Sequence, residues 1–146
     1  MRNKFMFGSL VLAAFFSLAA CSKKYSAPSN TSTFSGTMSG ASETPANSSA
    51  GTGTASFSYD SYTKILTGTV DYSGVTATAA HIHTGTAGLA GAVVFDLGAT
   101  LTSPIAFTSV ALDATQESDL MNNLYYVNIH SAAYPGGEIR AQLIKQ

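Results

Sequence analysis

Apolar and polar residues alternate along short stretches of this chain with a period of two. In the stretch TASFSYD, Ala55, Phe57 and Tyr59 alternate with residues that carry a hydroxyl group. The stretch ILTGTVDY, residues 65–72, continues the alternation after a short polar turn. Because successive side chains of a strand point to opposite faces, this period indicates half-buried β-strands, and the two stretches predict a hairpin.

Further stretches of this kind predict strands at residues 34–39, 78–84, 92–97, 105–110, 124–130 and 138–144. With the hairpin, this makes about eight strands. One segment, LDATQESDLMNN, is helical instead, because Asp113 can cap a helix with Gln116 three residues later. Short strand spacing, abundant Gly, Ser and Thr, and the absence of Trp favour an all-β fold. We expect an antiparallel Greek-key β-sandwich or barrel of about eight strands, with one short helix across one end.

The three histidines of the chain fall at the polar positions of predicted strands. His81 and His83 are two residues apart, so they point to the same face of one strand. His130 ends another predicted strand, and Glu138 and Arg140 occupy the polar positions of a third. Each of these strands lies next to a glycine-rich turn. The sequence therefore predicts one polar cluster near one end of the sheet.

Three glycines at three-residue spacing follow the histidine pair. Gly85, Gly88 and Gly91 form a GxxGxxG run that leads directly into a predicted strand. A phosphate-binding GxGxxG motif opens a helix, so the run indicates a tight connection with unusual backbone angles. We expect Gly137, in a Pro-Gly-Gly turn, to serve the same structural purpose.

The stretches SGASETP, AAHIHTGTAGLAGAVVFDL and LYYVNIHSAAYPGGEIRAQL, taken in this order, resemble the CHRD domain, which is named after chordin and also occurs alone in exported bacterial proteins. The residues that match the family's signature positions are His81, His83, Gly85, Gly88, Gly91, His130, Gly137, Glu138 and Arg140. Ala141 and Ser131 depart from the pattern, which usually has Gly and Thr there. The resemblance implies an extracellular all-β domain without an established enzymatic activity.

Two interpretations of the polar cluster stay open. In the first, His81, His83 and His130 bind copper or zinc, because three neutral imidazoles suit these metals and leave one position for water. The arrangement resembles the copper side of Cu/Zn superoxide dismutases, although the zinc ligands and the disulfide of those enzymes have no counterpart here. In the second, the histidines form a hydrogen-bonded cluster that fixes strand register, with Glu138 paired to Arg140. A guanidinium beside a dication favours the second interpretation unless a carboxylate lies between them.

Catalysis is not expected. The hydroxyl-bearing residues Thr84 and Ser131 directly follow histidines, which places them on the opposite strand faces. The sequence therefore offers a base without a credible nucleophile.

The first residues of the chain indicate export. MRNKFMFGSLVLAAFFSLAAC has a short basic segment, an apolar stretch and then the only cysteine. The letters LAAC resemble a bacterial lipobox, so we expect a signal peptide over residues 1–20 and lipidation of Cys21. Residues 21–32 are polar and predict a flexible linker. The domain then spans residues 33–146.

Charge and location narrow the expected partners. Without residues 1–20, the chain has five basic and eight acidic side chains, a net charge of −3. The basic residues are scattered, which argues against nucleic-acid binding. We expect attachment to a membrane through the lipid, in the outer membrane or on the cell surface rather than in the inner membrane. The resulting hypothesis is a non-catalytic binding or scaffold lipoprotein of the bacterial envelope, with an extracellular protein or polysaccharide as partner. The alternative is a copper- or zinc-binding envelope protein.

Overall fold

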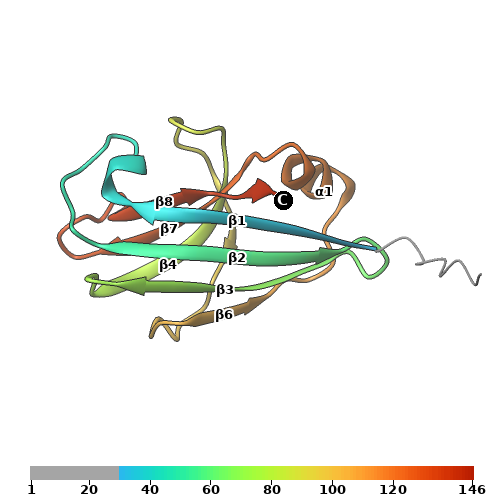
Figure 1. Cartoon of the computed structure of the whole chain (residues 1–146), viewed down its shortest axis with the longest axis horizontal. Helices are drawn as coiled ribbons and strands as arrows, with labels where there is room; N and C mark the ends of the chain where they lie inside the picture. The colour runs from blue at the N-terminus through green and yellow to red at the C-terminus, as the bar shows by residue number, and fades with distance from the viewer. Residues whose placement is uncertain (1–29) are drawn as a thin grey trace, which may run out of the picture.

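The computed structural model describes residues 30–146 (Figure 1). The predicted signal peptide, Cys21 and most of the predicted linker lie outside the described residues. The strands are β1 (Thr31–Ser39), β2 (Thr52–Asp60), β3 (Ile65–Ser73), β4 (Ala77–Thr84), β5 (Val93–Asp96), β6 (Ile105–Thr108), β7 (Tyr125–Ser131), β8 (Ile139–Gln142) and β9 (Ile144–Lys145). A 3-10 turn, η1 (Gly40–Ser42), follows β1, and one α-helix, α1 (Ala114–Met121), precedes β7.

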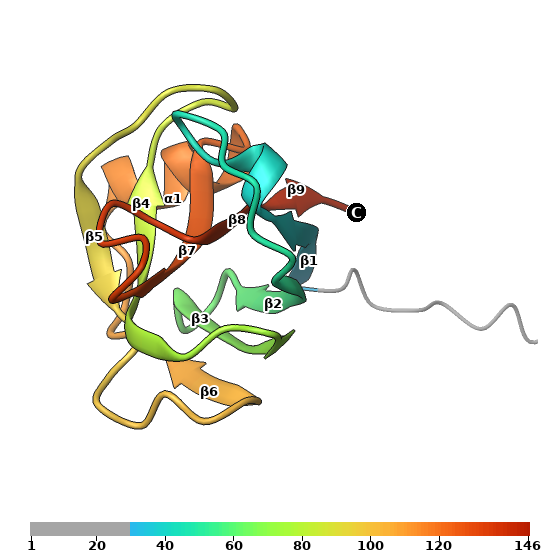
Figure 2. The same cartoon turned by 90° about the vertical axis from the view of Figure 1, so that its left-hand side faces the viewer.

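All strands belong to one antiparallel sheet. Its order is β5-β4-β7-β8-β1-β2-β3-β6, and β9 pairs with β1. The sheet curls into a half-barrel, which Figure 2 shows nearly along the strands. The two edge strands approach each other, because the rings of Phe95 in β5 and Phe107 in β6 have centroids 5.6 Å apart. The predicted fold class, antiparallel all-β with one short helix, is confirmed.

The apolar core lies inside the curl. Period-two alternation places every second residue of each strand there, and the largest fully buried side chains are Tyr59, Tyr125, Phe34, Met38, Leu66, Ile82, Ile105, Leu120, Ile129, Ile139, Leu143 and Val70. The inner face of the sheet thus supplies most of the hydrophobic stabilisation.

The helix begins as the sequence predicts. The Asp113 carboxylate accepts a hydrogen bond from the Gln116 backbone N–H at 2.9 Å, and the Gln116 side chain accepts one from the Asp113 N–H at 3.0 Å. Leu120 is buried in the core, so α1 closes one end of the half-barrel (Figure 1). No helix within residues 30–146 is long and apolar enough to cross a membrane.

Several strand ends differ from the prediction by one or two residues, and two further differences follow from strand pairing. β1 starts at Thr31, because Thr31 and Ser32 pair with Asp60 and Tyr59 of β2, so the sheet takes in the last two residues of the predicted linker. The last predicted strand is divided at Leu143, because β8 pairs with β7 whereas β9 pairs with β1.

Candidate metal centre

Polar side chains gather on the outer face of β4, β7 and β8. The strand register places His81, Asn128 and Arg140 in one row across the three strands. It places His83 and Tyr126 side by side in the next row. Because cross-strand neighbours share a face, these residues form one group. We call it the outer polar layer; its members are His81, His83, Tyr126, Asn128, His130, Glu138, Arg140 and Gln142.

Most of the outer polar layer is buried, although it lies on the outside of the sheet, and only His81, His130 and Gln142 are half-buried. Arg140 is 2% exposed, Tyr126 3% and Asn128 3%. Two segments cover it: the glycine loop between β4 and β5 (residues 85–92) and the connection between β1 and β2 (residues 40–51). Arg140 donates to the Leu89 carbonyl oxygen of the first at 2.9 Å, and Asn47 of the second donates to the Gly137 carbonyl oxygen at 3.2 Å.

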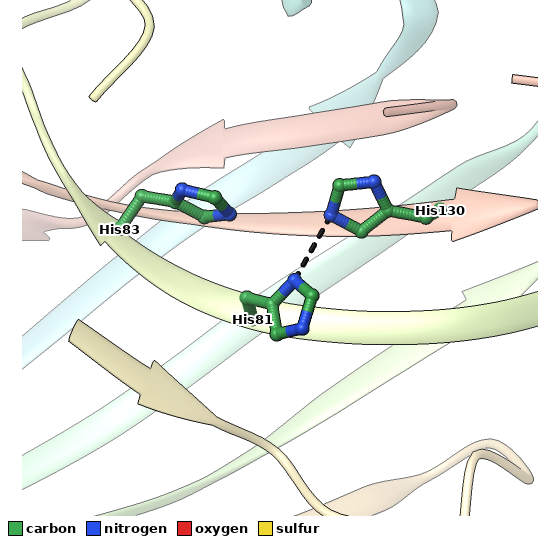
Figure 3. Close-up of side chains that lie close together, drawn as sticks. All are labelled: His81, His83 and His130. Atoms are coloured by element: carbon green, nitrogen blue, oxygen red, sulfur yellow. Dashed lines mark hydrogen bonds between the residues drawn. The ribbon is translucent and has the colours of Figure 1, made fainter. Parts of the chain in front are cut away.

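The three histidines lie together within this layer. Figure 3 shows their imidazole rings turned toward one another, two from β4 and one from β7. His81 Nδ1 and His130 Nε2 are 3.0 Å apart, and the rings of His81 and His83 have centroids 5.6 Å apart. One ring nitrogen from each histidine lies within 4.8 Å of the other two.

Backbone carbonyls determine which nitrogen each ring presents. His83 Nδ1 lies 3.0 Å from the Gly91 carbonyl oxygen, and His130 Nδ1 lies 2.9 Å from that of Pro135. A carbonyl oxygen only accepts, so each Nδ1 carries a proton and each Nε2 has a free lone pair. His130 Nε2 then accepts from His81 Nδ1. The donor set toward a metal is therefore Nδ1 of His81 with Nε2 of His83 and His130.

One of these donors has no hydrogen-bond partner among the described residues. His83 Nε2 is buried and unbonded, although buried polar atoms are nearly always paired. Burial lowers the pKa of His83. The hydrogen bond to the Gly91 carbonyl acts to raise this pKa, and the nearby His81, His130 and Arg140 lower it further. Burial also lowers the pKa of His130. Both rings are thus held neutral near pH 7, the form that binds metals.

The spacing of the nitrogens suits a single copper or zinc ion. With metal–nitrogen bonds of about 2.0–2.1 Å, two imidazole nitrogens on one ion lie roughly 3–4 Å apart. The His81–His130 separation of 3.0 Å is already in this range. The two most widely separated ligand nitrogens lie within 4.8 Å of each other, so they would have to approach by under about 1 Å to share one ion. For Nδ1 of His81 to hold an ion, its proton would have to move to Nε2 of the same ring, which gives the other neutral tautomer.

Glu138 and Arg140 do not pair with each other as the second sequence interpretation expected. Glu138 accepts a hydrogen bond from the Ser49 hydroxyl at 2.7 Å. Arg140 lies over the Tyr126 ring, with its guanidinium carbon 3.4 Å from the centroid, and donates to backbone carbonyls of the glycine loop. The pairing was wrong because backbone carbonyls, which sequence patterns do not reveal, take the guanidinium protons. The Tyr126 ring lies between Arg140 and His83, so the guanidinium does not contact the imidazole directly, although its charge still lowers the pKa of His83.

The structure adds a buried carboxyl that the sequence analysis did not single out. Glu43 Oε1 accepts a hydrogen bond from Asn128 Nδ2 at 2.8 Å. Burial raises the pKa of Glu43 to about 7, although the Thr44 backbone and Arg140 act to lower it. Both residues could have been singled out from the sequence, because Glu43 lies in the stretch SGASETP and Asn128 lies on the polar side of β7. A Cβ atom at Gly137, where φ is +135°, would clash with Asn128 Nδ2.

The other predicted glycines shape the glycine loop. Gly85 and Gly88 have φ angles of +154° and +81°. Gly91 lacks a positive φ, but a Cβ atom there would clash with the Thr84 carbonyl oxygen. This close approach brings the Gly91 carbonyl to His83.

Comparison with known proteins gives one finding. The family model of the CHRD domain matches residues 34–143, which include the whole outer polar layer and the glycine loop. No curated protein and no solved structure matches the chain significantly. With this match over most of its length, the chain belongs to the CHRD domain family.

Proposed function

We propose that this CHRD domain binds one copper or zinc ion through His81, His83 and His130. The observation that carries the proposal is the buried Nε2 of His83, which faces the other two histidines and has no hydrogen-bond partner among the described residues. A bound ion supplies the missing partner. The strands and two backbone carbonyls hold the three rings in place, so binding requires little rearrangement.

A purely structural histidine cluster accounts for less of the geometry. The His81–His130 hydrogen bond could fix strand register by itself. It leaves His83 Nε2 buried and unsatisfied, which costs about 1–3 kcal/mol. A metal site explains why the third histidine is directed at the other two.

We assign the domain a binding role rather than a catalytic one. The Thr84 hydroxyl donates to Asp119, and the Ser131 hydroxyl accepts from the Tyr134 backbone N–H. Neither makes a hydrogen bond with a histidine, which supports the absence of an activated nucleophile in this part of the chain. An extracellular protein or polysaccharide remains the expected partner of the domain.

We also propose that the protein is exported and tethered to the bacterial envelope by a lipid on Cys21. The support is the apolar segment that ends in LAAC and the polar residues that follow it. In bacteria fed an alkyne fatty acid, the wild-type chain should become labelled and sediment with membranes, and Cys21→Ser should do neither. Equal labelling of the two chains would refute the anchor.

Metal affinity tests the site. In competition with a chromophoric chelator, His81→Ala should lower the affinity for Cu²⁺ or Zn²⁺ by more than about 100-fold, because it removes a direct ligand. Saturating metal should raise the melting temperature of the wild type and leave that of His81→Ala unchanged. Ser56→Ala, in the exposed outer face of β2, is the matched control. Equal affinity in wild type and His81→Ala would contradict the proposal.

A further inference from the structure

The His83 ring is held by two independent contacts, one on an edge and one on a face. Its Nδ1 donates to the Gly91 carbonyl oxygen at 3.0 Å. Its face stacks on Tyr126, with ring centroids 4.9 Å apart and planes inclined by 7°. A rotated imidazole would lose the carbonyl contact and would no longer present Nε2 to His81 and His130.

Tyr126 contacts both the His83 ring and the peptide that orients it. The Tyr126 hydroxyl accepts a hydrogen bond from the Gly91 backbone N–H at 3.1 Å. The tyrosine therefore fixes the glycine whose carbonyl holds His83. Tyr126 itself is 3% exposed, so little solvent competes for these contacts.

Arg140 holds Tyr126 and the glycine loop at the same time. Its guanidinium carbon lies 3.4 Å from the centroid of the Tyr126 ring. Its two terminal nitrogens donate to the carbonyl oxygens of Leu89, at 2.9 Å, and Thr86, at 3.0 Å. A planar, rigid guanidinium can stack and donate in two directions together, whereas a lysine ammonium cannot.

We propose that Arg140 and Tyr126 are positioning residues for His83 in the metal site. Arg140 clamps the glycine loop and the Tyr126 ring, Tyr126 holds Gly91, and Gly91 directs the His83 Nε2 toward the other two histidines. Neither residue belongs to the three histidines that would hold the metal. The inference rests on the proposed function for its effect on metal binding, but the orientation of His83 can be measured without metal.

The first measurement uses the metal-free full chain. Nitrogen-15 correlation spectra of the histidine rings should show His83 in the wild type as one Nδ1-protonated tautomer. In Arg140→Lys and Tyr126→Phe, the His83 signals should broaden or show a second tautomer. Tyr125→Phe is the matched control, because Tyr125 is the adjacent tyrosine and its buried hydroxyl has no hydrogen-bond partner among the described residues. Unchanged His83 spectra in both variants would overturn the positioning role.

The second measurement uses Cu²⁺ alone as the probe. Arg140→Lys should weaken Cu²⁺ binding by about 10- to 100-fold and change the hyperfine splitting in the electron paramagnetic resonance spectrum, as the loss of groups that orient ligands does. If Arg140→Lys does not fold, Tyr126→Phe is the second variant, because it keeps the stacked ring. It should weaken binding by roughly 10-fold, whereas Tyr125→Phe should not. Variants with wild-type affinity and spectrum would overturn the positioning role. A wild type that binds no Cu²⁺ or Zn²⁺ would instead overturn the proposed function, and the metal-free spectra would then decide the positioning role alone.

Discussion

Hydroxyl side chains cover the outer face of β1, β2 and β3, whereas imidazole, amide and guanidinium groups cover the outer face of β4, β7 and β8. In the first region Thr33, Ser58 and Thr67 form one row across the strands. In the second, His81, Asn128 and Arg140 form the equivalent row. The two rows share one sheet and one alternation of inner and outer positions.

The two faces differ most in burial. Thr33 and Thr67 are exposed, as expected for the outer face of an antiparallel sheet. Asn128 and Arg140 are 3% and 2% exposed, because two loops fold over them. Buried polar groups require partners, so the covered face has a dense hydrogen-bond network and the exposed face does not need one. Two buried atoms of the covered face have no hydrogen-bond partner among the described residues, His83 Nε2 and Asn128 Oδ1, and only His83 Nε2 belongs to the group of three histidines that could hold a metal.

We expect the largest change in the covered face if the glycine loop is displaced. In Gly91→Ala the new methyl group would clash with the Thr84 carbonyl oxygen, so the loop must move away from His83. We expect a loss of about 3 kcal/mol in the free energy of unfolding, measured by urea denaturation, together with loss of metal binding.

Gly88→Ala is the control for that substitution. Gly88 has a φ of +81°, but a methyl group added there would meet nothing within 4 Å, so only backbone strain of roughly 1 kcal/mol is expected. Metal affinity should remain unchanged. If Gly91→Ala were no more harmful than Gly88→Ala, the close approach of the loop to β4 would not matter.

The two faces should also differ in how the free energy of unfolding depends on pH, because the pKa values of Glu43 and Asp60 shift in opposite directions. Burial raises the pKa of Glu43, which lies in the segment over the covered face, to about 7 from 4.5. On the exposed face, hydrogen bonds from the Thr63 and Tyr62 backbone lower the pKa of Asp60. A carboxyl with a raised pKa stabilises the fold while it is protonated, so its contribution is complete below pH 4.5 and is lost as the pH rises through about 7.

We therefore expect the wild type to lose about 2 kcal/mol relative to Glu43→Gln between these two pH values. Urea denaturation across this range measures the difference. The pKa values of His83 and His130 are lowered, so their contributions to the free energy of unfolding rise with pH. These contributions are the same in wild type and Glu43→Gln and cancel in the comparison. Asp60→Asn should leave the pH dependence in this window unchanged. Parallel pH profiles for wild type and Glu43→Gln would mean that the Glu43 carboxyl is solvated.

The smallest effect is expected on the exposed face. Ser56 is exposed in the middle of β2, and Ser56→Ala should change the free energy of unfolding by less than about 0.5 kcal/mol. Its metal affinity should equal that of the wild type. A larger loss of stability would show that the hydroxyl rows also act as a network.

Local patterns predicted the fold well. Alternation with a period of two located the strands, and the Asp113–Gln116 capping box located the helix, because both signals depend on residues near each other in sequence. The spacing of His81 and His83 placed them on one face for the same reason. The partner exchange at Leu143 depends on which strands meet in space, so alternation alone could not reveal it.

The contacts of the site were less predictable. Arg140 binds backbone carbonyls of a loop about fifty residues earlier, and a carbonyl has no signature in the side-chain sequence. The burial of Glu43 depends on the same covering of the outer face by loops. Long-range loop placement, rather than strand patterning, therefore limits what the sequence reveals about this site.

The metal content of the purified, untagged chain tests the central claim most directly. The chain is offered Cu²⁺ and Zn²⁺, dialysed exhaustively and measured by mass spectrometry beside His83→Gln. We predict about one ion per wild-type chain and none in a His83→Gln chain that remains folded by circular dichroism. A wild-type chain that is folded and metal-free would contradict the account and make the three histidines a structural cluster.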